Sequence, residues 1–303
     1  MNAIINVNGQ VLGPHEAKVS IFDRGYLYGD SLYEVARSYG AQFYLLDQHL
    51  DRLKRSAELC KMKLDQDSAT YKREIYKTLE AFRALPGNSE RDAYMRLIVS
   101  RGSGKIGFSL SAIQTPTLYT IIVQSLDGMI PQRSAQRPPE GIKVRISPRI
   151  RMDRRALDPA MKSGNYLNSL LAYLDAAENG FDDALLCDYE GNLTEGTTFN
   201  LFYVRREIVA TPPLENGILV GVTRSKVLEI AKDLGIQVRE VRFPRERLFE
   251  ADEVFLTSSL KEVLPIVQID GRKIGDGNTG PITQKLQYAY RQKITQDTQR
   301  SLL

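Results

Sequence analysis

A lysine in the middle of the chain is the residue whose type and setting most directly suggest chemistry. Lys162 lies in DPAMKSGNYLNSLL, just before a stretch with the apolar pattern of a helix, and none of its nearest neighbours is acidic. Burial would favour the neutral amine, a nucleophile that can form a Schiff base with an aldehyde. A lysine in such a place is usually only a surface residue, so the interpretation depends on the rest of the chain.

Two segments match the glycine pattern of dinucleotide-binding loops, G-x-G-x-x-G. They are Gly102–Gly107 and Gly275–Gly280. Neither is followed directly by a clear helix, and neither lies in a strand-helix-strand unit with an acid about 20 residues further on. The sequence also contains no G-x-S-x-G or H-E-x-x-H motif. An NAD oxidoreductase is therefore disfavoured.

The cysteines and histidines are too few for a metal centre or a disulfide framework. The chain has Cys60 and Cys187, and two histidines far apart in sequence, His15 and His49. This composition is typical of a reducing compartment, and the N-terminal segment MNAIINVNGQ has no pattern of a secretory signal. No stretch approaches the roughly 18 apolar residues of a membrane span. We therefore expect a cytoplasmic protein without a metal.

The net charge is small and positive, +4, but one segment concentrates arginine. Between Arg145 and Arg155 the chain carries five arginines and one aspartate. No aromatic residue is interleaved there, which disfavours nucleic-acid binding and favours a solvated loop.

The N-terminal part predicts hairpins and helices. The segment IINVNGQVL predicts a hairpin that turns at Asn8-Gly9. Apolar residues recur at three- and four-residue steps from Leu46 to Met62, which predicts a helix. A second helix is expected from about Ala69 to Ala84, before Pro86-Gly87, and strands are expected in YMRLIVS and TLYTIIVQSL.

A proline-rich segment without apolar periodicity, residues 127–141, predicts a linker between a domain at 1–126 and a domain at 142–303. In the second domain we expect helices from about Asn165 to Asn179, in VTRSKVLEIAKDL and at the C-terminus. Strands are expected in IKVRIS, ALLCD, TFNLFYV, QVREVRF and EVFLTS. The mixture predicts two α+β domains.

Ordered blocks of sequence surround Lys162 at compatible spacing. They are DRGYLYGDSLYEV, HLDRLKRSA, MKSGNYLNSLLAYLDAAENGFDDALLCDYEGNLTEGTTFNLF, GVTRSKVLEIAKDLGI and ADEVFLTSSLKEVLPI. With these blocks, nearly the whole chain resembles the class IV aminotransferases, pyridoxal-phosphate enzymes of fold type IV. The resemblance implies a small N-terminal α/β domain, a larger C-terminal domain with a β-barrel-like core, pyridoxal 5′-phosphate as cofactor, and a homodimer.

The resemblance also implies the cofactor contacts. Lys162 would be the Schiff-base lysine and the base that moves a proton between Cα and C4′. Glu195, in LTEGTTFN, would pair with the pyridine nitrogen and keep it protonated, which makes the ring an electron sink. The other cofactor-binding residues would be Arg52, Val222, Thr223 and Ser259 for the phosphate and Tyr166 beside the phenolic oxygen. Without the resemblance, Glu195 would be a turn carboxylate and Arg52 a solvated helix side chain.

The substrate-binding residues leave two readings open. Tyr94-Met95-Arg96, Arg37 and Tyr28 resemble those of branched-chain aminotransferases, whereas Tyr33 and Arg101 resemble the carboxylate trap of D-amino-acid aminotransferases. The chain has YEV where branched-chain enzymes have FEG, and TSSLKEV departs from the SGTAAE-type turn of both groups. Arg37, Arg96 and Arg101 cannot all have their family roles.

The sequence thus predicts a ping-pong aminotransferase that moves an amino group from an amino acid to a 2-oxo acid such as 2-oxoglutarate. Branched-chain L-amino acids are favoured as donors, and D-amino acids are the alternative. An aminodeoxychorismate lyase or an (R)-amine transaminase is less favoured. A non-catalytic basic binding protein would keep the arginine run but would need neither Lys162 nor Glu195. The expected partners are small molecules, with no nucleic acid and no membrane.

Overall fold

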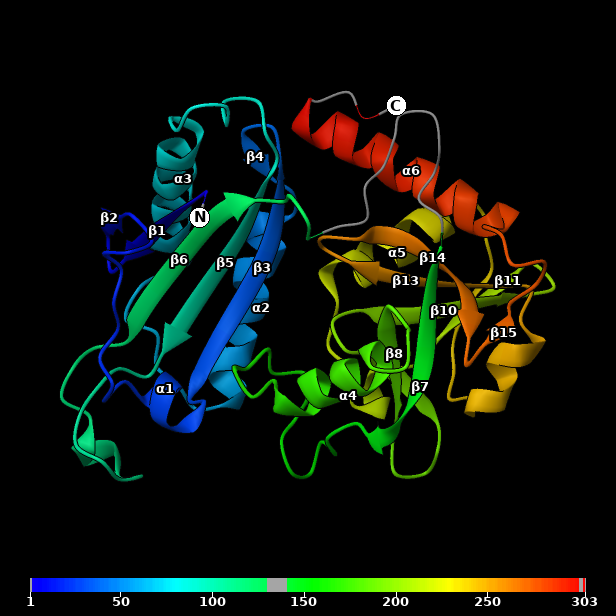
Figure 1. The fold of residues 1–303 in the computed structure, drawn as a ribbon, viewed down its shortest axis with the longest axis horizontal. Coiled ribbons are helices and arrows are strands. Elements are labelled where there is room, and N and C mark those ends of the chain that lie inside the picture. Colours follow the sequence, from blue (N-terminus) through cyan, green and yellow to red (C-terminus); the bar gives the residue numbers. More distant parts are fainter. Residues whose placement is uncertain (1, 130–140, 300–301, 303) are drawn as a thin grey trace. The chain divides into compact units, whose positions relative to one another are not determined.

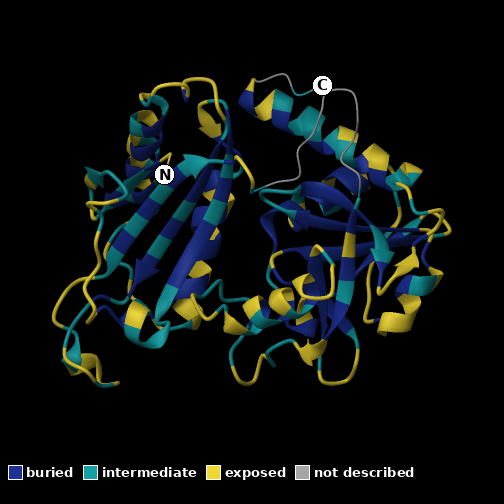
Figure 2. Ribbon diagram, in the orientation of Figure 1, coloured by how far each residue is buried: buried dark blue, intermediate teal, exposed yellow. Residues whose placement is uncertain are grey.

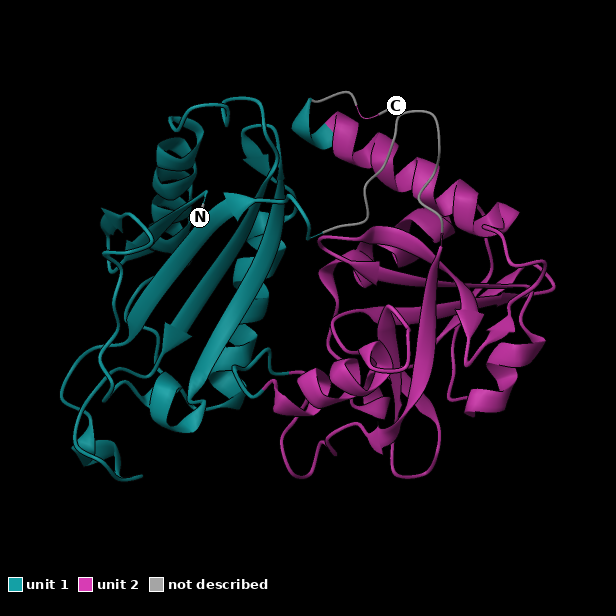
Figure 3. Ribbon diagram, in the orientation of Figure 1, with its two compact units in different colours: residues 1–129, 161–165, 297–300 teal, residues 130–160, 166–296, 301–303 magenta. Residues whose placement is uncertain are grey.

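A computed structural model of the chain describes residues 2–129, 141–299 and 302 (Figure 1). The chain forms two compact units (Figure 3). The first comprises residues 2–129, Met161–Asn165 and 297–299, and the second comprises residues 141–160, Tyr166–Gln296 and 302. Most of the predicted linker, residues 130–140, lies outside the described residues. The chain thus returns to the first unit at the short segment that carries Lys162.

The first unit is built on an antiparallel sheet with the strand order β2-β1-β6-β5-β3-β4. The predicted hairpin is confirmed: Asn8 and Gly9 both have positive φ at its turn, as this tight turn requires. The strands are β1 (Ala3–Val7), β2 (Gln10–Leu12), β3 (Ser31–Tyr39), β4 (Gln42–Phe43), β5 (Ala93–Ser100) and β6 (Leu118–Ser125).

Two helices, α2 (Leu46–Leu59) and α3 (Ser68–Arg83), pack on this sheet. Their buried apolar side chains form one core with alternate residues of the strands, such as Leu32 and Ala36 of β3. Both helices are confirmed, although α2 ends earlier than Met62 because Lys61 adopts a left-handed backbone. A five-residue helix, α1 (Arg24–Tyr28), was not predicted, and a 3₁₀ turn, η1, covers Leu110–Ala112.

The second unit contains a closed barrel. Its strands pair around the ring β10-β13-β14-β7-β8-β9, and a pair between Asn200 and Glu195 joins β9 back to β10. Leu201, Leu256 and Leu264 lie in register on neighbouring strands and point into its core. Most residues of the barrel strands are buried (Figure 2), except toward the end of β7, where residues 148–150 are exposed. They are β7 (Ile142–Ile150), β8 (Asp183–Cys187), β9 (Leu193–Gly196), β10 (Asn200–Arg205), β13 (Glu253–Ser258) and β14 (Glu262–Ile269). The barrel-like core implied by the resemblance is confirmed.

Shorter strands and helices surround this barrel. Helix α4 (Leu167–Ala177) connects the parallel strands β7 and β8, and α5 (Val222–Asp233) connects the parallel strands β11 (Ile208–Thr211) and β12 (Val238–Glu240). The strand predicted in QVREVRF is shorter in the structure, where only Val238–Glu240 form β12. The remaining elements are β15 (Arg272–Lys273), η2 (Leu214–Asn216), η3 (Arg245–Glu250) and α6 (Pro281–Thr298). None of the helices in the described ranges combines the length and the apolar character needed to cross a membrane.

A stacked pair of phenylalanines on the outer side of the barrel gives a test of this packing. The rings of Phe202 and Phe255 lie 4.9 Å apart and both side chains are fully buried. We expect Phe255→Ala to lower the free energy of unfolding by about 3–5 kcal/mol, since it removes a packed ring and leaves a cavity. Urea denaturation followed by circular dichroism measures this change. Tyr288→Ala, at a half-exposed aromatic side chain, is the control and should change stability by less than about 1 kcal/mol.

Candidate active site

The backbone around Lys162 is fixed in the first unit by the edge of β3. The carbonyl of Lys162 accepts a hydrogen bond from the Tyr33 amide (2.9 Å), and the Gly164 amide donates to the carbonyl of Ser31 (2.8 Å). On the other side, the Lys162 amide donates to Ser56 Oγ of α2 (3.1 Å). A Cβ on Gly164 would lie 2.3 Å from Ser31 Oγ, so a larger residue here would have to displace the Ser31 hydroxyl. The structure therefore holds Lys162 in one place.

The amine of Lys162 lies against a buried tyrosine. Its Nζ is 3.2 Å from the hydroxyl of Tyr33 and 4.4 Å from the centre of its ring. The guanidinium of Arg96 lies 4.1 Å from the same ring centre. Three residues that the sequence singled out, Lys162, Tyr33 and Arg96, are therefore neighbours in the first unit.

The other two candidate arginines are engaged elsewhere in the first unit. Arg37 forms an ion pair with Asp92 (3.1 Å), although it shares a sheet face with Tyr33, Tyr94 and Arg96. Arg101 forms an ion pair with Asp30 (2.8 Å), and its guanidinium also donates to the carbonyls of Cys60 and Lys61. The structure thus places Arg96, and neither Arg37 nor Arg101, against the ring that Lys162 touches.

Tyr28 lies in α1, on a different part of the first unit. Its hydroxyl accepts a hydrogen bond from the Gly107 amide (2.9 Å), and its ring lies 5.3 Å from that of Phe108. The guanidinium of Arg24 lies 5.0 Å from the Tyr28 ring centre. In this structure Tyr28 is therefore occupied with the loop that contains Phe108.

Arg52 is buried beside a carboxylate and an imidazole that the sequence analysis missed. Its Nε and Nη2 bind the two carboxylate oxygens of Glu34 at 2.8 and 2.6 Å, and His49 Nδ1 lies 2.8 Å from Glu34 Oε2. Burial alone would raise the pKa of Glu34, but Arg52 and His49 outweigh it and lower the pKa to about 2. The strand alternation of β3, which places Glu34 on the same side as Leu32 and Ala36, was the available signal.

In the second unit, Glu195 is a buried carboxylate with three partners. Its Oε1 forms an ion pair with Arg151 Nη2 (2.7 Å). Its Oε2 accepts hydrogen bonds from the Leu219 amide (3.0 Å) and from Asn200 Nδ2 (3.3 Å). The sequence did not single out Arg151 or Asn200, and Arg151 belongs to the arginine run that it predicts to be solvated. The carboxylate is therefore oriented by a cation, an amide and a side-chain donor.

The N-terminus of α5 lies close to these residues. Its cap, Gly221, comes so near to Asn200 that an added Cβ would lie 1.9 Å from Asn200 Oδ1. Among the described residues no side chain caps this helix end, so its first backbone N–H groups, including those of Val222 and Thr223, could bind an anion. The structure thus gathers Val222 and Thr223 near Asn200 and hence near Glu195.

Thr257, which the sequence does not single out, lies on the same face of the sheet as Asn200 and Glu195. Thr257 pairs in register with Asn200, which pairs with Glu195, so these three side chains share one face. Thr257 Oγ1 is buried and has no hydrogen-bond partner among the described residues. An orphaned buried hydroxyl of this kind is unusual and marks a place where a ligand can bind.

Two more of the predicted residues, Ser259 and Tyr166, lie next to the ends of other elements. Ser259 begins the turn between β13 and β14, where Lys261 Nζ binds Asp183 (2.9 Å) and Glu262 has a left-handed backbone. Tyr166 precedes α4, is half-buried, and accepts the Leu170 amide with its carbonyl (2.9 Å). Ser259 therefore lies just beyond the end of β13, the strand that contains Thr257.

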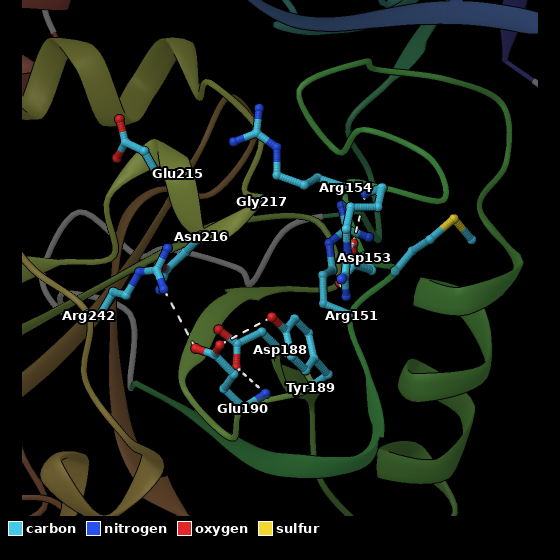
Figure 4. A pocket seen from close by; sticks show the side chains of 12 residues that line it. Arg151, Asp153, Arg154, Asp188, Tyr189, Glu190, Glu215, Asn216, Gly217 and Arg242 are labelled. Atoms are coloured by element: carbon cyan, nitrogen blue, oxygen red, sulfur yellow. Dashed lines mark hydrogen bonds and ion pairs between the residues drawn. The ribbon is translucent and has the colours of Figure 1, made fainter.

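The arginine-rich segment lines a cavity of about 200 Å³ in the second unit (Figure 4). Four of the five arginines of the run have ion pairs, with Arg151 bound to Glu195 and Arg155 to Asp153 (2.9 Å). Arg242 lies across from Glu190 (3.6 Å) in the same cavity. Acidic and basic side chains are thus balanced here, and the run is not an unpaired basic surface.

Comparisons with known proteins identify related sequences and structures. Residues 31–269 match the model of the amino-transferase class IV family. A putative branched-chain-amino-acid aminotransferase from Methanocaldococcus jannaschii is 38% identical over 95% of each chain. A D-alanine aminotransferase from Bacillus licheniformis is 32% identical over 97% of this chain and 98% of its own. The solved structure of the branched-chain amino acid aminotransferase from Thermobaculum terrenum in its PLP form superposes with a TM-score of 0.83 and 28% identity, over 96% of this chain and 93% of its own.

Proposed function

Because the chain belongs to the class IV aminotransferases, we propose that it uses pyridoxal 5′-phosphate to transfer amino groups from an amino acid to a 2-oxo acid. We propose branched-chain L-amino acids as the main donors and 2-oxoglutarate as an acceptor. The observation that carries the proposal is the amine of Lys162, which the structure fixes through its backbone and places 3.2 Å from the Tyr33 hydroxyl.

The residues present fit this cofactor, which carries a phosphate, a ring nitrogen and an aldehyde. The second unit offers an uncapped helix N-terminus, the orphaned hydroxyl of Thr257 and the buried carboxylate of Glu195. The first unit offers the amine of Lys162 and the buried guanidinium of Arg52. When bound, pyridoxal 5′-phosphate supplies an electron-withdrawing ring that stabilises negative charge at the Cα of the amino acid.

Each of these residues then has a defined task. Lys162 Nζ would hold the aldehyde and would act as the base that moves the proton between Cα and C4′. Glu195 holds a proton on the ring nitrogen, and its orientation comes from Arg151 and the Leu219 amide. By the resemblance, Arg52 would neutralise phosphate charge. In the second unit, the α5 N-terminus, Thr223, Thr257 and Ser259 could donate hydrogen bonds to a phosphate.

The substrate carboxylate is assigned to the group around Tyr33. Arg96 supplies the positive charge and Tyr33 a hydroxyl, and both lie with Lys162 in the first unit. Arg37 and Arg101 hold structural ion pairs with Asp92 and Asp30 in this proposal.

A D-amino-acid transaminase is the second candidate, since a D-alanine aminotransferase is among the relatives and Tyr33 suits both groups. The deciding experiment follows the loss of the absorbance band near about 410–420 nm when single amino donors are added to the holoenzyme. We expect L-leucine and L-valine to discharge the band faster than D-alanine or D-glutamate, with a 2-oxo acid as product. Faster discharge by D-alanine would establish the second candidate, and discharge only by (R)-1-phenylethylamine would refute both.

We also propose that the enzyme is a homodimer, on the ground of an exposed apolar stripe along α4. Leu167, Leu170 and Leu174 lie at helical spacing on one side of this helix and are 64%, 48% and 42% exposed. Such a stripe is typical of an interface. The resemblance implies a homodimer too, so a second copy of the chain is the proposed occupant.

We expect Leu170→Asp combined with Leu174→Asp to convert a dimer to a monomer, because two charges would be buried without partners. Sedimentation velocity measures the mass, and Leu214→Asp, at an exposed leucine outside α4, is the control. A wild-type monomer, or a double variant that stays dimeric with its fold intact, would contradict this interface.

The state of the two cysteines supports a proposal for the cellular compartment of the protein. Neither Cys60 nor Cys187 forms a disulfide, and burial raises the pKa of the Cys187 thiol to about 11, which makes it unreactive. We therefore propose a reducing cytoplasmic environment. Small-molecule substrates are the proposed partners.

A further inference from the structure

Glu34, His49 and Arg52 form a buried cluster in the first unit. Their residues are 0%, 1% and 4% exposed. Glu34 binds Arg52 through both oxygens, and the second of these oxygens also contacts His49 Nδ1 at 2.8 Å. A bidentate contact of this kind fixes the plane of the guanidinium as well as its position.

The protonation states of the cluster follow from its contacts. The pKa of Glu34, lowered to about 2, keeps it a carboxylate, and burial, which outweighs Glu34, lowers the pKa of His49 and keeps it neutral. A neutral imidazole has one N–H, and the carboxylate can only accept, so Nδ1 carries the hydrogen and donates to Glu34. His49 Nδ1 therefore cannot accept a hydrogen bond from Arg52 Nη2, which lies 3.3 Å away. The cluster has one negative and one positive charge.

Stability alone does not explain a buried charge pair at this position. Removing two ions from water is costly, and apolar side chains of similar volume often give equal or greater stability. The surrounding core of Leu50, Leu53 and Leu32 shows that apolar residues suit this interface between β3 and α2. The pair therefore calls for a role that needs a fixed charge.

The position of Arg52 on α2 indicates what that role is. Ser56 follows one helical turn later on the same side of α2 and accepts the hydrogen bond of the Lys162 amide (3.1 Å). Arg52 is thus held one turn away from the residue that anchors Lys162. The cluster and the anchor share a single rigid helix.

We propose that Glu34 and His49 are positioning residues for cofactor binding: Glu34 locks the guanidinium of Arg52 in the orientation that receives the cofactor phosphate, and His49 locks Glu34. The proposal rests on the proposed function, because it takes Arg52 as a phosphate-binding residue. An arginine fixed beforehand loses little side-chain freedom when the phosphate binds, which strengthens binding.

The test compares the affinities of the apoprotein for pyridoxal 5′-phosphate and for pyridoxal, which lacks the phosphate. We expect Glu34→Gln to weaken binding of pyridoxal 5′-phosphate by about 10- to 100-fold, by analogy with the loss of metal affinity when the partners of metal-binding side chains are removed. Binding of pyridoxal should stay within about twofold of wild type. Fluorescence titration gives both dissociation constants. Glu74→Gln, at another buried carboxylate of the first unit that accepts from Asn6 (3.1 Å), is the control.

Two variants at His49 keep the test valid if Glu34→Gln does not fold, since both retain the pair of Glu34 and Arg52. His49→Leu removes the donor to Glu34 and should weaken binding of the phosphorylated cofactor selectively. His49→Asn restores an N–H near the position of Nδ1 and should recover most of the affinity.

The outcomes separate this inference from the proposed function. Equal losses for both cofactor forms, or no loss for either, would overturn the positioning role and leave the aminotransferase assignment intact. A wild-type protein that binds no pyridoxal 5′-phosphate would refute the proposed function and this inference with it.

Discussion

Lys162→Ala should abolish the absorbance band near about 410–420 nm and lower the rate of transamination by at least about 10²–10⁴-fold. The range is that of losing a general base alone, and the loss of covalent attachment to the cofactor adds to it. The structure makes the substitution selective, because the backbone of residue 162 is held by the Tyr33 amide and by Ser56 Oγ. Absorbance spectra of the purified variant and steady-state assays of 2-oxo acid formation measure the two effects.

Lys143→Ala, at an exposed lysine of β7, is the matched control and should leave both the spectrum and the rate unchanged. Borohydride reduction of the wild-type holoenzyme, followed by peptide mass spectrometry, should place the cofactor on Lys162. A label on another lysine, or a variant that keeps the band, would remove the basis of the proposed mechanism.

Local patterns in the sequence were enough to predict most of the secondary structure. The Asn8-Gly9 dipeptide predicts the hairpin, because the tight turn needs positive φ at both residues and Asn-Gly favours it. Apolar residues at helical spacing predict α2. Helix α1 was missed because five residues are too few to show a periodicity, although Asp23 and Gly29 cap it in the usual way.

Contacts between distant parts of the chain could not be predicted in this way. The pairing of Lys162 with the edge of β3 joins residues 129 positions apart, and no local pattern encodes it. The ion pair of Arg101 with Asp30 crosses 71 positions, so the sequence could not separate it from a substrate-binding role. The closure of the barrel likewise depends on a pair between Asn200 and Glu195 that only the folded sheet defines.

The residues of the candidate site divide in the same way, into those that local sequence identifies and those that only the folded structure identifies. The resemblance singled out Lys162, Arg52 and Glu195 because their neighbours in sequence form recognisable blocks. The residues that hold them carry no such signal: Glu34 lies in the block DRGYLYGDSLYEV without a role assigned to it, and Arg151 lies outside every block. They become visible only as partners, through the distances of 2.6 Å to Arg52 and 2.7 Å to Glu195.

Glu195→Gln should lower the rate of transamination by about 10²–10³-fold, the usual cost of removing one preorganised electrostatic group. An amide has no negative charge, so it cannot keep a proton on the ring nitrogen, and the ring then withdraws electrons less well. The amide oxygen can still accept from the Leu219 amide and from Asn200, which leaves the amide NH2 facing Arg151 in place of Oε1. Single-turnover kinetics with L-leucine measure this chemical step without product release.

The size of this effect also depends on Arg151, because its guanidinium would face a neutral amide in the variant. Glu195→Asp keeps the charge and should recover part of the rate, whereas Glu190→Gln, at an exposed carboxylate of the preceding turn, should leave it unchanged. If Glu195→Gln bound the cofactor and reacted at the wild-type rate, this carboxylate could not be the group that controls the ring nitrogen. The charge pair with Arg151 would then be a structural contact of the barrel alone.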